Sequence, residues 1–153
     1  MKEFVRVLIW VAVLGGILFG VYTVLPEYPH NYVKALVQPV VNAQAKKRIL
    51  QVKNLKNEEM DALYQNILEK NTRNTCWVYE EGVGIETVTF YGSGATINIK
   101  DLENHDDHLY TSTLVKFEFV ITGNSVDITA YIENQAQDDE VKELMIQQLY
   151  QGR

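Results

Sequence analysis

The stretch "IETVTFYGSGATINIK", residues 85–100, decides the fold of the C-terminal part of this chain. Side chains alternate between apolar and polar along residues 85–91 and again along 95–99, which is typical of strands with one buried face. Gly92 and Gly94 lie between the two runs, and "YGSG" predicts a hairpin turn there. A connection this short favours antiparallel neighbours.

The same pattern extends in both directions from this stretch. Alternation with a period of two predicts further strands at residues 75–80, 109–121 and 125–132, with turns at "EGVG" and "TGNS". Asn57 is a plausible N-cap for the helical sequence "EEMDALYQNILEKN", and Asp138 for a last helix with Val141, Leu144, Met145 and Leu149 on its buried side. The sequence therefore predicts an α+β domain: a meandering antiparallel sheet of about five strands with helices on one face.

Strand alternation also predicts a second, polar sheet face that points away from the helices. A surface rich in Thr and Tyr suits a partner, because tyrosine offers a large contact area with one polar group. The alternative is an ordinary solvated face, since both residue types are also good strand formers. The predicted partner or ligand face comprises Thr89, Tyr91, Asn98, Lys116, Asp127, Thr129 and Tyr131.

The N-terminal residues predict a transmembrane helix. Residues 7–25 carry no charge, and nineteen residues of helix rise about 28 Å, close to the thickness of the hydrocarbon core. No small-x-small pair follows this segment, so it is interpreted as an uncleaved anchor covering residues 1–25. Ala12, Gly16 and Gly20 recur every fourth residue on one helix face, which predicts a homo-oligomer that packs through the membrane helix.

The charges near this segment leave its orientation open. Lys2 and Arg6 precede it, which favours a cytoplasmic N-terminus and an extracytoplasmic C-terminal domain. The basic juxtamembrane cluster Lys46, Lys47 and Arg48 fits the alternative, a segment that faces an anionic cytoplasmic leaflet. This cluster lies in residues 26–53, which are predicted to form a helical stalk between the anchor and the domain.

Charge divides the chain more clearly than any linker. Residues 1–53 hold seven Lys and Arg against two acidic residues, whereas residues 54–153 hold seven against eighteen, a net charge of −11. An acidic domain repels phosphate backbones, which argues against nucleic-acid polymers as partners. The expected benefit of this charge is solubility.

"ENHDDH", residues 103–108, is the best candidate for chemistry. His105, Asp107 and His108 are residue types that bind metals, but they lie in a predicted loop between strands. A solvated acidic loop is therefore the favoured interpretation, with no metal or cofactor expected. No phosphate-binding glycine loop and no GxSxG motif is present. We therefore expect a non-enzymatic single-pass membrane protein that serves as a structural, assembly or partner-binding subunit of a membrane complex. Its alternatives are a membrane sensor whose cytosolic domain binds a small ligand, for example a nucleotide messenger, and a metal-dependent hydrolase.

Overall fold

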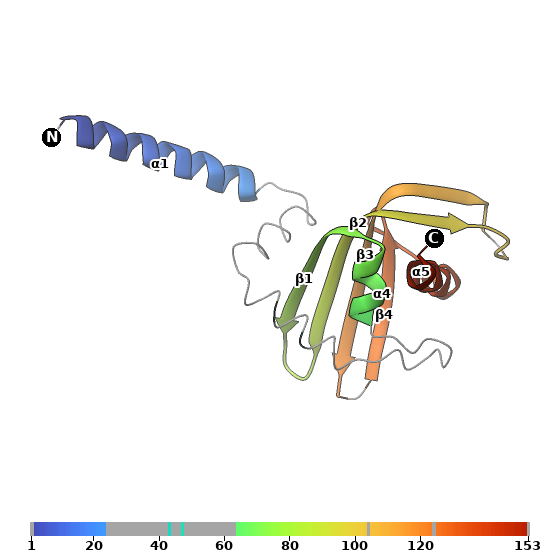
Figure 1. Ribbon diagram of the computed structural model, residues 1–153. Coiled ribbons are helices and arrows are strands. Elements are labelled where there is room, and N and C mark those ends of the chain that lie inside the picture. Colours follow the sequence, from blue (N-terminus) through green and yellow to red (C-terminus); the bar gives the residue numbers. More distant parts are fainter. Residues whose placement is uncertain are drawn as a thin grey trace.

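A computed structural model describes residues 2–23, 43, 47, 64–103, 105–123 and 125–152, with side chains from residue 5 to residue 21 in the first range. Three helices and five strands are described in chain order (Figure 1). They are α1 (Lys2–Thr23), α4 (Tyr64–Lys70), β1 (Arg73–Glu81), β2 (Glu86–Ile99), β3 (His108–Thr122), β4 (Ser125–Ile132), β5 (Gln135–Ala136) and α5 (Asp139–Gln151).

The five strands form one antiparallel sheet in the order β1-β2-β3-β4-β5, so each strand pairs with its neighbour in sequence. This confirms the predicted α+β class and the meander. The fifth strand, β5, was not predicted: it follows a tight turn at Glu133 and Asn134, whose φ angles are 50° and 67°. Two residues in the left-handed region are what a two-residue hairpin loop requires.

The predicted turn at "YGSG" is wrong, because β2 continues through it as one strand of 14 residues. Gly94 has a φ of 74° and inserts an extra residue between the pairs Gly92↔Val115 and Ala95↔Thr113. The glycines therefore form a β-bulge, which bends a strand without ending it. The sequence pattern could not separate the two cases, since both require a left-handed glycine.

Bulges on three neighbouring strands lie close together in the sheet. Asn74 in β1 and Ser112 in β3 have φ angles of 48° and 53°, and each lies where the register with β2 shifts. Bulges increase local twist and bend, and three side by side bend the whole sheet. Beyond them, the end of β2 and the start of β3 leave the main sheet and pass over α5 (Figure 1). We call this part, residues 95–99 of β2 with 108–111 of β3, the arm.

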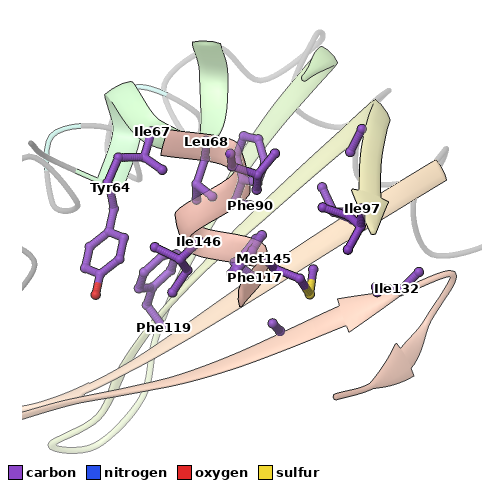
Figure 2. Packing of buried hydrophobic residues seen from close by; sticks show 14 of the residues in the cluster. Tyr64, Ile67, Leu68, Phe90, Ile97, Phe117, Phe119, Ile132, Met145 and Ile146 are labelled. Atoms are coloured by element: carbon purple, nitrogen blue, oxygen red, sulfur yellow. The ribbon is translucent and has the colours of Figure 1, made fainter. Parts of the chain in front are cut away.

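The core lies between one face of the sheet and the helices α4 and α5. Figure 2 shows labelled side chains of both helices and of strands β2, β3 and β4 gathered in one cluster. Trp77 is fully buried, with its ring centroid 4.8 Å from that of Phe90 and 6.4 Å from that of Phe119. Both helices cover the same face, as predicted. Of the residues predicted to be buried on α5, Val141, Met145 and Leu149 are buried and Leu144 is partly buried.

Both ends of α5 are capped, and the N-cap at Asp138 is the one that the sequence predicted. The Oδ1 atom of Asp138 accepts a hydrogen bond from the backbone N–H of Val141 at 3.0 Å. At the other end, Gly152 adopts a φ of 78°, and its N–H donates to the carbonyl of Gln148. The side chain of Asn71, next to α4, donates to the carbonyl of Leu149 and so ties the two helices together. Of the helix predicted after Asn57, residues 57–63 lie outside the described residues.

Helix α1 stands apart from the sheet (Figure 1), and every side chain described in it is exposed. The hydrophobic segment read from the sequence ends at residue 25, two residues beyond the end of α1 at Thr23. In the part of the chain that the structure describes, no helix combines the length and the hydrophobicity needed to cross a membrane.

Candidate partner surface

The outer face of the sheet includes two rows of side chains that run across β1 to β4 and hold most of the residues predicted for a partner face. Strand pairing places six of the seven residues predicted for a partner face on this side, as alternation requires. One row is Cys76, Tyr91, Lys116 and Tyr131, and the other is Val78, Thr89, Glu118 and Thr129. Asp127 follows them on β4.

Most of this face is not accessible on the central strands. Tyr91, Lys116 and Thr89 are only 2%, 8% and 9% exposed. The ammonium of Lys116 lies 4.0 Å from the ring centroid of Tyr131, a cation–π contact that occupies both side chains. Accessibility therefore increases toward β4, where Asp127 is exposed and Tyr131 half-buried. The sequence predicted which residues form this face but not their burial. Alternation predicts the side of the sheet to which a side chain points, and it does not predict whether other residues cover that side chain.

Asn98, the seventh residue of the predicted face, lies apart from the others, in the arm. Its backbone N–H donates to Oε1 of Gln148 at 2.8 Å, and its carbonyl accepts from Nε2 of Gln148 at 2.7 Å. The carboxamide of Gln148 thus takes the place that a peptide group of a neighbouring strand would take. β1 pairs with β2 only as far as Ser93, so among the described residues no strand lies at this edge of the arm, and α5 covers it instead.

Next to this contact lies a groove of about 430 Å³ between α5 and the arm. Two leucines line it together with neutral polar side chains. Its lining residues are Thr96, Asn98, Leu109, Leu144, Gln147, Gln148 and Gln151. None of these carries a positive charge, whereas a nucleotide messenger needs partners for its phosphates. The groove therefore does not favour the nucleotide-sensor alternative.

In the "ENHDDH" stretch between β2 and β3, His105 contacts the residue that caps α5. Nε2 of His105 lies 2.7 Å from Oδ2 of Asp138, and its Nδ1 lies 3.1 Å from the carbonyl oxygen of Glu103. The hydrogen bond to Glu103 and the charge of Asp138 raise the pKa of His105 above its ordinary value. The hydrogen bond from the N–H of Val141 and the charge of His105 lower the pKa of Asp138. This ion pair connects the loop to the N-cap of α5.

The three residues considered for a metal site are each engaged with other groups. His105 binds Asp138, Oδ1 of Asp107 accepts from the backbone N–H of Asp101 at 3.3 Å, and His108 lies edge-on to Tyr110 with centroids 4.3 Å apart. Within the described ranges, no three His, Cys, Asp or Glu side chains are grouped so that they could hold a metal ion. The loop therefore brings no ligand set together.

Cys76 is fully buried in β1, and this burial raises the pKa of its thiol to about 11. A thiol is reactive as the thiolate, so this environment makes the cysteine inert at neutral pH. Buried thiols of this kind pack as small apolar side chains.

Of the remaining predicted residues, Ala12, Gly16 and Gly20 lie in α1. A Cβ atom added at Gly16 or Gly20 would meet nothing within 4 Å, so the stripe that they form with Ala12 is open along this helix. Lys47 is exposed, while Lys46 and Arg48 lie outside the described residues.

Comparison of the chain with protein-family models, with curated proteins and with solved structures gave no match.

Proposed function

We propose that the chain is a non-enzymatic single-pass membrane protein, a structural, assembly or partner-binding subunit of a membrane complex, whose N-terminal helix associates with further copies of itself. One observation supports this most: the side chains of residues 7–21 in α1 are apolar and exposed around the whole helix. Trp10, Leu18 and Phe19 are 66%, 68% and 69% exposed, and Arg6 is the single charged residue among residues 5–21.

An apolar surface of this extent is not stable in water. Exposed apolar patches beyond a few hundred Å² mark protein or membrane contacts, and a helix that is apolar on all sides is typical of lipid or of a large core. In this proposal the membrane segment is residues 7–25 of the sequence, with residues 26–53 as a stalk and Lys46, Lys47 and Arg48 near the bilayer surface.

Extraction of isolated membranes at alkaline pH tests the anchor. The full chain should remain with the membranes, because alkaline carbonate releases peripheral but not inserted proteins. Leu14→Lys should release a large part of it, since a lysine near the helix centre costs about 2.5–3.5 kcal/mol on insertion scales. Val83→Lys is the control, because Val83 is fully exposed at the turn between β1 and β2. Recovery of the unaltered chain in the soluble fraction would disprove the proposal.

Association through α1 needs a separate test. Gly16→Leu and Gly20→Leu should weaken oligomers that survive in mild detergent, because both side chains would separate closely packed backbones. Gly15→Leu is the matched control: it adds the same side chain on the same helix, outside the stripe. Equal oligomer yield in all three variants would exclude packing through this stripe.

We place the domain on the extracytoplasmic side, on the strength of Lys2 and Arg6 before the hydrophobic segment. Cys76 cannot report on this because it is buried, so a reactive cysteine has to be introduced at the exposed turn as Val83→Cys. Intact cells should label with a membrane-impermeant maleimide. Labelling only after lysis would reverse the orientation.

A further inference from the structure

The loop between β2 and β3 contacts the start of α5 through His105. We call residues 101–107 the β2–β3 loop; Asn104 lies outside the described residues. Nε2 of His105 lies 2.7 Å from Oδ2 of Asp138. The other oxygen of this carboxylate, Oδ1, accepts the N–H of Val141 and so caps the helix. A single carboxylate therefore holds the end of the helix and the loop together.

Both ring nitrogens of His105 face oxygen atoms. Nδ1 lies 3.1 Å from the carbonyl oxygen of Glu103, and Nε2 faces the carboxylate of Asp138. A carbonyl and an ionised carboxylate only accept hydrogen bonds, whereas a neutral imidazole has a single N–H and the imidazolium has two. The charged ring alone can make both hydrogen bonds. Loss of its proton leaves a lone pair of the ring against one of these oxygens, so one of the two contacts has to break.

The β2–β3 loop is also closed by hydrogen bonds that do not involve this ring. The N–H of Asp101 donates to Oδ1 of Asp107, and the backbone N–H of His105 donates to the carbonyl of Leu102, both at 3.3 Å. Leu102 itself packs against the core. These contacts do not depend on protonation of the imidazole, so we expect the loop to keep its own conformation when the ring leaves Asp138.

Like charges oppose docking of this loop once His105 is neutral. The loop and the start of α5 are both acidic, and carboxylates repel one another. The lysine beside each segment pairs locally, Lys100 with Asp101 at 3.9 Å and Lys142 with Asp139. Neither of these ion pairs crosses from the loop to the helix, whereas that of His105 does. The carboxylates are those of Asp101, Glu103, Asp106 and Asp107 in the loop and of Asp138, Asp139 and Glu140 at the helix.

We propose that His105 is a pH switch: the protonated ring docks the β2–β3 loop on the start of α5, and the neutral ring releases it. The hydrogen bond to Glu103 and the charges of Asp138 and Glu140 raise the pKa of His105, while the N–H of Val141 and the charge of His105 lower the pKa of Asp138. The loop is therefore docked between these two pKa values. It is released as pH rises through the pKa of His105, and again as pH falls through that of Asp138. The switch involves no residue of α1 and stands independently of the membrane proposal.

Distances between two spin labels on the full chain in mild detergent test the switch. Asp106→Cys places one label on the β2–β3 loop and Gln147→Cys the other on α5, and both positions are exposed. Cys76 is buried and takes no label in the folded chain. Pulsed electron paramagnetic resonance should show one main distance at about pH 6 and an added, longer distance at about pH 9, above the range in which histidines titrate. The ratio of docked to released loop should fall about two- to fivefold between them, as expected for a partly exposed ion pair.

Three variants in this labelled background identify the group responsible. His105→Gln, which is neutral at every pH, and Asp138→Asn, which still caps α5, should both abolish the response to pH. His108→Gln is the matched control, because it removes the neighbouring histidine, at the start of β3, and should leave the response unchanged. The proposal is overturned by equal distance distributions at the two pH values, by a response that persists in His105→Gln or Asp138→Asn, or by one that is lost in His108→Gln.

Discussion

Replacing Gln148 by alanine should destabilise the fold measurably, although the side chain is not part of the core. The variant loses both hydrogen bonds that connect α5 to the backbone of Asn98 in the arm. A hydrogen bond contributes about 0.5–1.5 kcal/mol net. Both bonds lie at the surface, where water can replace them, so we expect about 1–1.5 kcal/mol for the pair from the lower part of that range. In a folded unit of this size, this lowers Tm by about 4–12 °C.

Thermal unfolding followed by circular dichroism of the full chain in mild detergent measures this loss. Gln147→Ala is the matched control, because it removes an equal side chain from the next position of the same helix, where it is exposed. Gln148→Glu should lie at or below the alanine variant, since it keeps one acceptor but places a carboxylate against the carbonyl of Asn98. The reasoning is refuted if Gln148→Ala and Gln147→Ala unfold at the same temperature.

Three further predictions concern the bulge, the ion pair and the thiol. Gly92→Ala should lower the free energy of unfolding by about 1–3 kcal/mol in denaturant, because the added Cβ would lie 2.8 Å from Cβ of Thr72 and 2.9 Å from the ring of Phe90. Gly82→Ala should be tolerated, because the atom nearest to its Cβ would be 3.5 Å away. In an NMR titration, the pKa of His105 should exceed that of a free histidine and should fall in Asp138→Asn; an unchanged value contradicts the ion pair. Stabilisation by His105 is complete below its unfolded pKa and is lost as pH rises through its raised pKa, while that by Asp138 is lost as pH falls through its lowered pKa. Cys76 should react with a thiol reagent only after denaturation, and rapid labelling of the native chain would contradict its burial.

Most of the sheet could be predicted because strand alternation is a local property. The predicted boundaries of β3 and β4 were close to those observed, and Thr89, Tyr91 and Lys116 were assigned to the correct face. The predicted turn at "YGSG" failed because a left-handed glycine serves a turn and a bulge equally well. The choice between them depends on whether the partner strand continues, and β3 does continue past Gly94 to His108.

The candidate site could be predicted only in part, since its decisive contacts connect distant residues. Asn98 and Gln148 are 50 residues apart, and nothing in the local pattern of either marks the pair. His105 was recognised as a residue able to do chemistry, but its partner Asp138 was noticed only as a helix cap. Local patterns thus identified the residue types, while the bend of the sheet at the three bulges determined which of them meet.

The strand order has a consequence for how the chain folds. Every strand pairs with the one made just before it, so each hairpin can close as soon as its second strand has been synthesised, at a small loss of chain entropy. The contact between Asn71 and Leu149 spans 78 residues and can form only when α5 is complete. We therefore expect the meander to assemble during synthesis and the docking of α5 on α4 to be the last, rate-limiting step. A chain truncated before residue 139 would then hold an ordered sheet with part of its apolar side uncovered.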